Sequence, residues 1–473
     1  MDYTCLKEIQ KALLSGKTTT EELVNVYLSN IEYTRHLNAY VEVYNIEALE
    51  RAKDLDQKIK NHPESLGKLF GCIISVKDLI VFKNHKVNAG SKILDGFESQ
   101  FNATAVESVL LEDAIIIGRT NCDEFGMGSA NLNSFFGPVH NAADPNRISG
   151  GSSGGAAVSV QTDTCLIALG TDTGGSVRQP ASMCGVYGFK PGYGMVSRYG
   201  LIAYASSFDQ LGIIAKNVED IETVMSIVSV SDDYDATMFQ SGLYNEQKSQ
   251  NQPDLNKLKI AYIADAFEND ALDSEIKVIG YQFLSDLKSK VVSVEAISFP
   301  LLEYVVPCYY ILTTAEASSN LSRYDGVRYG YRSVNVTSTE ELYVHTRTEG
   351  FGKEVKKRIM LGSFVLSEAY YDAYFTKAQQ VRRMIKDRMD TFFDQFDLIV
   401  LPSSPNVAWH IHSKPTDPLE IYMADIYTVL ANLAGIPAIS IPLGNNTEKM
   451  PFGIQVLSRI KEEGKLLNFC KLI

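Results

Sequence analysis

The chain has 473 residues, of which 45% are hydrophobic and 21% are charged. These proportions exclude a disordered chain and a small disulfide-held domain, and they allow a large buried core. The formal net charge of −13 argues against direct binding of nucleic acid phosphates by this chain, but it leaves room for a basic partner that binds them.

The N-terminal part of the chain has the pattern of helices. In TTEELVNVYLSNIEY, Thr19 and Glu22 have the spacing of a capping box, in which each residue satisfies a free N–H of the first turn. Leu23, Tyr27 and Ile31 then repeat at intervals of four, which places them on one apolar face. This segment therefore predicts an amphipathic helix.

From about residue 70, short apolar runs alternate with turns rich in glycine and asparagine. Such runs are typical of strands buried in a sheet that helices cover, and here they read GCIISV, AIIIG, CLIALG, GVYGF, LIVLP and AISIPL. Helical patterns lie between them, for example ATAVESVLLEDA and VEDIETVMSIVSV. The alternation predicts an α/β fold with a large mixed or parallel sheet.

Two later segments carry further predictions about organisation. Residues 245–256 are polar and contain a proline, which fits either a surface loop or a domain linker. Residues 369–396 have the periodicity of one long amphipathic helix.

The cysteines and the absence of long apolar runs indicate the compartment. The seven cysteines contain no C-x-x-C pair, and several lie in apolar runs, so we expect buried free thiols in a reducing compartment. The start MDYTCLKEIQ is polar, and no apolar run approaches the roughly 20 residues that span a bilayer. We therefore expect a cytoplasmic protein without membrane contact.

Two glycine-rich turns that carry serines flank one predicted strand. The first reads GGSSGGAAV from residue 150, and the second reads GTDTGGSVRQP from residue 170 and contains Ser176. Backbone N–H groups crowded in such a turn could stabilise an oxyanion beside a serine nucleophile. A phosphate cradle is the rival function, but neither turn has the lysine of a P-loop. Ordinary tight turns explain the glycines equally well.

A serine nucleophile needs a base, and the seven histidines lie outside these turns. His410 and His412 could share a strand face, but no further ligands have matching spacing, so we expect no metal site. Lys77 directly follows the run GCIISV, at the end of the predicted strand, and could serve as the base if burial lowers its pKa. A lysine at a strand end often just extends to solvent, and the residues alone do not bring Lys77 to Ser176.

The two turns together closely resemble the signature of the amidase family, which uses a Ser–Ser–Lys triad. The resemblance implies that Ser176 is the nucleophile, that Ser152, 24 residues earlier, is the bridging serine, and that Lys77 in V-K-D is the base. It also implies that the turn residues Thr173, Gly174 and Gly175 form the oxyanion hole. The implied fold is a large mixed sheet covered on both faces by helices, in a single domain over 1–473 whose N-terminal helices, about 1–65, pack on the core.

Further segments resemble one branch of this family, the A subunits of tRNA-dependent amidotransferases. The resemblance covers most of the chain, for example GRTNCDEFGMGSANLNSFFGPVHN, and general amidases typically lack the blocks RYDGVRYG and EGFGKEVKKRI. It implies a glutaminase that supplies ammonia to a B subunit, which converts Glu-tRNA(Gln), or also Asp-tRNA(Asn), with ATP and Mg²⁺. A C subunit would complete the heterotrimer, the tRNA would bind mainly through the B subunit, and this chain would need no cofactor. A stand-alone amidase and a non-catalytic module are the alternatives.

The same resemblance implies which side chains bind glutamine. Arg358 would bind its α-carboxylate and Asp425 its α-ammonium group, and Tyr309 is a third candidate for the pocket. Without the resemblance, a surface arginine and a turn-capping aspartate would be the simpler interpretation. We also expect Ser153 to support Ser152, and Asp172 and Arg178 to fix the nucleophile turn.

Overall fold

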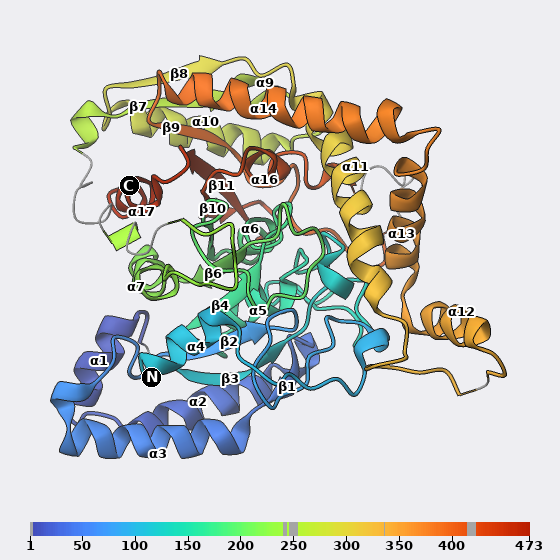
Figure 1. The fold of residues 1–473 in the computed structure, drawn as a ribbon. Helices are drawn as coiled ribbons and strands as arrows, with labels where there is room; N and C mark the ends of the chain where they lie inside the picture. Colours follow the sequence, from blue (N-terminus) through green and yellow to red (C-terminus); the bar gives the residue numbers. More distant parts are fainter. Residues whose placement is uncertain (1–2, 240–243, 246–253, 335, 414–421) are drawn as a thin grey trace.

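Eleven strands form one sheet through the centre of the computed structural model, which describes residues 3–239, 244–245, 254–334, 336–413 and 422–473 (Figure 1). The strands are β1 (Tyr40–Val43), β2 (Ile73–Lys77), β3 (Ile115–Thr120), β4 (Ile167–Thr171), β5 (Tyr187–Lys190), β6 (Leu211–Ala215), β7 (Lys259–Ile263), β8 (Ser293–Ile297), β9 (Leu398–Pro402), β10 (Ala438–Asn445) and β11 (Pro451–Ser458). Their order across the sheet is β1-β3-β2-β4-β6-β5-β10-β11-β9-β7-β8.

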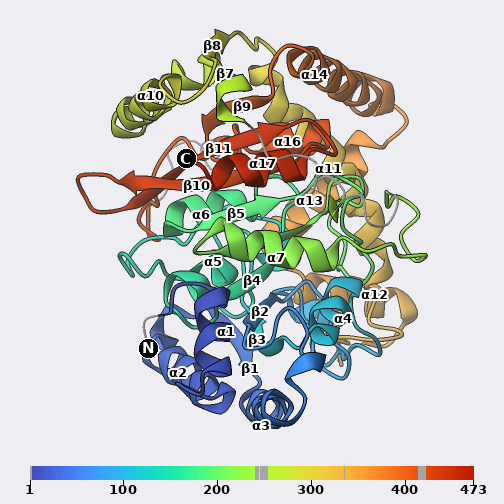
Figure 2. The same ribbon diagram turned by 90° about the vertical axis from the view of Figure 1, so that its left-hand side faces the viewer.

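The α-helices lie between these strands in the chain. They are α1 (Leu6–Leu14), α2 (Thr20–Tyr33), α3 (Asn45–Asn61), α4 (Thr104–Leu111), α5 (Gly154–Gln161), α6 (Arg178–Cys184), α7 (Val218–Val228), α9 (Ala264–Phe267), α10 (Ser274–Lys288), α11 (Leu302–Asn320), α12 (Thr339–Gly350), α13 (Lys353–Val365), α14 (Lys377–Phe393), α16 (Val429–Ala434) and α17 (Glu463–Cys470). The helices α1, α2 and α3 gather at the β1 edge, whereas α10 and α14 lie at the β8 end (Figures 1 and 2).

The sheet is mixed, as the sequence predicts. Strand β2 runs parallel to both β3 and β4, and β7 runs parallel to β8 and β9, while the remaining pairs are antiparallel. Because β2 and β4 are parallel neighbours, their C-terminal residues lie at the same edge. That edge receives Lys77 from β2 and Thr171 from β4.

Strand β9 illustrates how both faces of the sheet are buried. Leu398 and Val400 belong to one hydrophobic core with residues of α10 and α17. Ile399 and Leu401 belong to a second core with residues of α11, α14 and α16. Since alternate side chains of a strand point to opposite faces, a run that is apolar throughout needs helices on both sides. The continuous apolar pattern of LIVLP therefore has a direct structural cause.

Most of the local predictions are confirmed. Thr19 caps α2 in a complete capping box with Glu22, and each of the six quoted apolar runs overlaps a strand. The prediction of one helix over 369–396 is only partly right, because residues 372–376 form a π-helical turn before α14 begins. Tyr371 directly precedes this turn and Phe375 lies within it, with ring centroids 5.1 Å apart and the rings tilted by 39°. An apolar periodicity does not distinguish a π-helical turn inside a helix from regular α-helix. Much of the segment 245–256 lies outside the described residues.

Two observations concern the predicted compartment. In the described ranges, no helix combines the length and apolar character needed to span a bilayer. The seven cysteines are free thiols, six of them buried.

Candidate active site

Lys77 ends β2 inside a cage of hydroxyl groups. Its Nζ lies 2.8 Å from Ser152 Oγ, 2.8 Å from Ser153 Oγ and 2.9 Å from Thr171 Oγ1. The side chain is fully buried, and among the described residues it makes no ion pair with a carboxylate. A hydroxyl can either donate or accept a hydrogen bond. The cage therefore satisfies both an ammonium, which donates to all three oxygens, and a neutral amine, which accepts a proton from one of them.

Burial lowers the pKa of Lys77 to about 8, against the pull of nearby acidic groups that include Asp123 and Asp172. Desolvation acts in this direction because a low-dielectric environment disfavours the charged form of an amine. About one tenth of the lysine is therefore neutral at pH 7, far more than at the ordinary pKa of an amine, and the neutral form is the one that a general base requires.

The two glycine-serine turns meet at this cage. Ser152 and Ser153 precede α5, and Ser176 precedes α6. The Ser153 N–H donates to the Ser176 carbonyl at 3.1 Å, which ties the two turns together. Ser152 and Ser153 are fully buried, whereas Ser176 is 8% exposed and its Oγ makes no hydrogen bond within the described residues. Of the three serines, Ser176 is thus the one that a substrate reaches most directly.

A buried ion pair holds the nucleophile turn in shape. Both oxygens of Asp172 accept from Arg178, at 3.0 Å from Nε and 3.0 Å from Nη2. Burial alone would raise the pKa of Asp172, but the Arg178 charge and its hydrogen bonds outweigh burial and lower the pKa to about 2. Asn432 completes the group, with its Nδ2 donating to Asp172 Oδ1 at 3.0 Å and its Oδ1 accepting from Arg178 at 2.7 Å. The prediction that Asp172 and Arg178 fix the nucleophile turn is confirmed.

The same turn presents backbone N–H groups beside Ser176. The N–H groups of Thr173, Gly174 and Ser176 have no acceptor in the described part of the chain, whereas the Gly175 N–H donates to Asp172 Oδ1 at 2.9 Å. An oxyanion would therefore find three free donors, and it would have to share the one on Gly175. Gly175 is required for another reason: its φ is +126°, and a Cβ there would lie 2.1 Å from Thr428 Oγ1.

Arg358, on α13, is buried rather than displayed on the basic surface of its helix. It is 5% exposed. Its Nε donates to Glu354 at 2.9 Å, and its Nη1 donates to Tyr204 Oη at 2.9 Å. Its guanidinium also lies 5.1 Å from the ring centroid of Tyr310. A buried arginine with one nearby carboxylate retains donors that can bind an anionic ligand.

Asp425 lies on the other side of Tyr310. Its Oδ2 accepts from Ser129 Oγ at 2.6 Å and from Tyr310 Oη at 3.1 Å. Burial raises the pKa of Asp425 to about 6, while these hydroxyls and the charge of Arg358 act to lower it. Tyr310 thus connects a buried cation to a buried anion. This pairing suits a ligand that carries one charge of each sign.

Tyr309 takes a different position from its neighbour Tyr310. A Cβ on Gly174 would lie 2.5 Å from Tyr309 Oη, so the end of the ring rests against the backbone of the nucleophile turn. The ring packs edge-on against Phe208, with centroids 6.0 Å apart. The structure therefore brings Tyr309 to the nucleophile and Tyr310 to the two charged residues.

Sequence reasoning missed several residues of this site. Thr171 completes the cage around Lys77, Tyr310 connects Arg358 to Asp425, and Tyr204 accepts a hydrogen bond from Arg358. Thr171 ends β4, and the parallel pairing of β4 with β2, which the apolar runs do not give, brings it to Lys77. The tyrosines come from loops and a helix whose packing the motifs do not specify.

Within the described residues, no group of three or more His, Cys, Asp and Glu side chains is placed to hold a metal ion.

Comparison with known proteins places this geometry in a family. The model of the family described as Amidase matches residues 22–467. The A subunit of the glutamyl-tRNA(Gln) amidotransferase of Chlorobaculum parvum is 44% identical over 474 residues, which cover 100% of this chain and 98% of that protein. The corresponding A subunit from Chlorobium phaeobacteroides is also 44% identical, over 100% of this chain and 99% of the relative.

Solved structures of the same family resemble this chain over nearly its whole length. The crystal structure of the glutamyl-tRNA(Gln) amidotransferase A subunit from Thermotoga maritima is 36% identical, with a TM-score of 0.77 over 99% of this chain and 93% of that one. The crystal structure of an amidase is 27% identical, with a TM-score of 0.82 over 98% of both chains. These matches show that the chain belongs to the amidase family, and that it is similar over its whole length to the A subunits of glutamyl-tRNA(Gln) amidotransferases.

Proposed function

We propose that this chain is the glutaminase subunit of a tRNA-dependent amidotransferase. It hydrolyses glutamine and supplies the ammonia that converts Glu-tRNA(Gln) to Gln-tRNA(Gln). The observation that carries the proposal is the hydroxyl cage around a fully buried Lys77, beside a more accessible Ser176. The full-length similarity to named A subunits supports the choice of glutamine over other amides.

The reaction begins with a proton relay. Neutral Lys77 takes the proton of Ser152, which takes the proton of Ser176 as its Oγ attacks the carboxamide carbon of glutamine. The N–H groups of Thr173, Gly174 and Ser176, with Gly175 shared, stabilise the oxyanion. Each such donor is typically worth about 3–4 kcal/mol.

The tetrahedral intermediate then collapses. The carbon–nitrogen bond breaks, the nitrogen takes a proton back through Ser152, and ammonia leaves a γ-glutamyl ester on Ser176. A water molecule attacks this ester, the relay takes its proton, and the ester bond to Ser176 Oγ breaks. Glutamate leaves, and both serines recover their protons.

Glutamine is held by its charged end. Arg358 binds the α-carboxylate through donors that Glu354 leaves free, and Asp425 binds the α-ammonium group. Tyr310 keeps the two residues at a fixed spacing, and Tyr309 lies between this pair and the nucleophile turn. A substrate without both charges would bind weakly, because a buried cation or anion would lose its partner.

The proposal includes the rest of the complex. A B subunit uses ATP and Mg²⁺ to activate the aminoacyl-tRNA and binds most of it, a C subunit holds the two larger chains together, and the complex is cytoplasmic. This chain needs no cofactor for glutamine hydrolysis. The acidic net charge of −13 agrees with a division of labour in which the partner contacts the tRNA. Whether Asp-tRNA(Asn) is also a substrate depends on the B subunit.

The test is glutamate release from glutamine by the complex of this chain with its B and C partners, in the presence of Glu-tRNA(Gln) and ATP. Wild type should release glutamate and form Gln-tRNA(Gln), and Ser176→Ala should do neither with glutamine. Because Ser176→Ala leaves the B subunit intact, added ammonium should restore amidation of the tRNA. Hydrolysis of other amides by wild type without hydrolysis of glutamine would instead favour a stand-alone amidase.

A further inference from the structure

Asp209, just before β6, joins two parts of the site that have been described separately. It is 7% exposed. Its Oδ1 accepts from Thr173 Oγ1 at 2.7 Å. Its Oδ2 accepts from the N–H groups of Tyr204 at 2.9 Å and Ala205 at 3.0 Å. One carboxylate therefore holds a side chain of the nucleophile turn and the backbone of a separate loop.

The hydrogen bond at Asp209 Oδ1 connects this residue to the oxyanion site through Thr173. Thr173 lies three residues before Ser176 and offers one of the free N–H groups of the turn. The backbone of the turn is also held by Asp172 and by Thr428, whose Oγ1 donates to the Gly174 carbonyl at 2.7 Å. Within the described residues, the Thr173 side chain has Asp209 as its hydrogen-bond partner.

The hydrogen bond at Asp209 Oδ2 connects this residue to Arg358 through Tyr204. The backbone N–H of Tyr204 is fixed by Asp209, and its hydroxyl accepts from Arg358 Nη1 at 2.9 Å and donates to Thr313 Oγ1 at 2.9 Å. The guanidinium of Arg358 lies 5.6 Å from the Tyr204 ring centroid. The position of the Tyr204 backbone therefore influences where the guanidinium lies.

We propose that Asp209 is a positioning residue that sets the spacing between the oxyanion-binding turn and Arg358. Glutamine held by its α-carboxylate then presents its carboxamide carbon to Ser176 at the right distance. The inference rests on the proposed function, since it assumes that Arg358 binds the substrate. Misplacement of a reacting group by about 1 Å can reduce a rate by about 100-fold, so a rigid connection between the two ends of the substrate matters.

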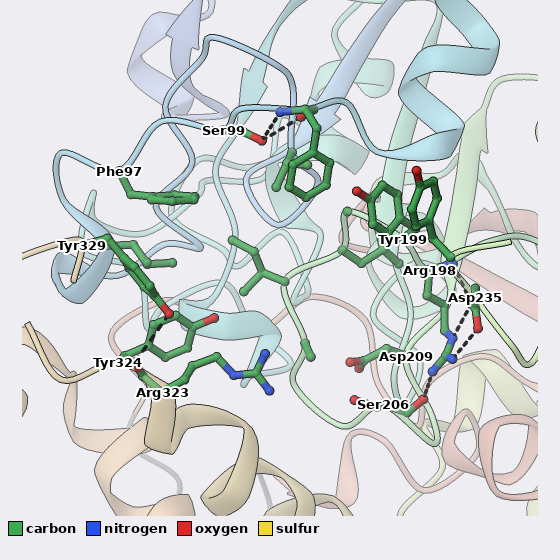
Figure 3. A pocket seen from close by; sticks show the side chains of 18 residues that line it. Phe97, Ser99, Arg198, Tyr199, Ser206, Asp209, Asp235, Arg323, Tyr324 and Tyr329 are labelled. Atoms are coloured by element: carbon green, nitrogen blue, oxygen red, sulfur yellow. Dashed lines mark hydrogen bonds and ion pairs between the residues drawn. The ribbon is translucent and has the colours of Figure 1, made fainter. Parts of the chain in front are cut away.

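The surroundings of Asp209 indicate that its loss would shift the loop without unfolding it. Asp209 borders a cavity of about 600 Å³, and Ser206 lies on the same wall (Figure 3). The loop keeps other anchors, because the Ser206 carbonyl accepts from Arg198, the Ser207 N–H donates to Glu316 at 2.9 Å and the Tyr204 carbonyl accepts from Asn320 at 3.2 Å. Burial raises the pKa of Asp209 to about 7, so hydrogen-bond geometry rather than a fixed charge is the main contribution expected of it.

The test compares steady-state constants for glutamine in the intact complex. Asp209→Ala should lower kcat/KM by about 100-fold, through both a lower kcat and a higher KM. Thr173→Val removes the hydroxyl that donates to Asp209 and should lower mainly kcat, whereas Tyr204→Phe removes the hydroxyl beside Arg358 and should raise mainly KM.

Asp209→Asn should stay within about fivefold of wild type, because its amide can donate to Thr173 Oγ1 while its oxygen accepts the two N–H groups. Asp209→Ala combined with Thr173→Val should lose less than the product of the single effects.

The control is Asp220→Ala, which removes another buried aspartate, one that accepts from the Leu6 N–H at 3.1 Å and lies in α7 away from the site. It should lower Tm and leave kcat and KM unchanged. The proposal is overturned if Asp209→Ala behaves like Asp220→Ala, or if Thr173→Val and Tyr204→Phe both keep wild-type constants. Failure of the proposed function is distinguishable, because wild type itself would then release no glutamate. If Asp209→Ala does not fold, the Thr173→Val and Tyr204→Phe results decide alone.

Discussion

The reaction centre and the substrate-binding cluster meet at the turn that carries Ser176, but they differ in the chemical groups that surround their key side chains. The reaction centre is Lys77, Ser152 and Ser176 with the cage residues Ser153 and Thr171. It comes from strand ends and two short motifs, and within the described residues its lysine is held by uncharged groups.

The substrate-binding cluster is Arg358, Asp425, Tyr309 and Tyr310. It comes from α11, α13 and the segment before α16, and it places a buried cation near a buried anion. The contrast teaches that a centre which must lose and regain a proton is surrounded by hydroxyls, whereas a cluster which must hold a zwitterion keeps its charges. Substitutions should therefore separate the two regions, in kcat for the first and in KM for the second.

The largest effect is expected at Lys77. Lys77→Met fills the same volume without a base, so kcat for glutamine should fall by at least about 10³-fold. Tm should change little, because the loss of the buried amine removes its desolvation cost but also removes the partner of the cage hydroxyls. Lys77→Arg should be equally inactive, since a guanidinium cannot become neutral in this pH range. An active Lys77→Arg enzyme would show that the charge, and not the proton relay, is what the site needs.

Arg358→Ala should affect the other region. It removes the group that binds the α-carboxylate, so KM for glutamine should rise by about 100-fold with a smaller change in kcat. The matched control is Arg383→Ala, which removes an arginine whose side chain is 76% exposed and pairs with Asp387 one helical turn away. The control should leave KM unchanged. An unchanged KM in Arg358→Ala would remove Arg358 from substrate binding.

The pH dependence of glutamine hydrolysis should report the pKa of Lys77, which is about 8. The neutral amine is the active form, so kcat/KM should rise with pH up to about pH 8 and level off above it. Below about pH 6 the rise should be steeper, because the Asp425 carboxylate that binds the α-ammonium group is then protonated as well. Arg358→Ala should keep this midpoint because it lies outside the reaction centre. A profile that is flat between pH 6 and pH 9 would contradict the assignment of Lys77 as the base.

Smaller changes in KM for glutamine are expected when Tyr310 or Tyr309 loses its hydroxyl, and Tyr310 should show the larger change. Tyr310→Phe removes one of the two hydroxyls that donate to Asp425, so KM should rise by about tenfold. Tyr309→Phe removes a hydroxyl that has no hydrogen-bond partner in the described residues, and KM should rise by about threefold or less. Steady-state assays of both variants would check this order. The reverse order would show that the Tyr309 hydroxyl contacts glutamine directly.

The two regions also differ in how far the sequence predicts them. The apolar runs before Lys77 and Thr171 predict two buried strands, and the motifs supply Ser152 and Ser176, but the pairing of the two strands comes from the structure. The pairing of Tyr310 with Asp425 spans 115 positions and depends on how α11 packs. Asp209 could not be singled out either, because its partners are a backbone loop and a threonine hydroxyl, which leave no periodic signal.

The most direct test of the account is to identify the covalent intermediate. The complex would be quenched with acid while it turns over isotopically labelled glutamine, digested, and analysed by mass spectrometry. We expect a labelled γ-glutamyl ester on Ser176 in wild type, and no label in Ser176→Ala. A labelled acyl group on any other residue, or glutamine hydrolysis that persists in Ser176→Ala, would contradict the account.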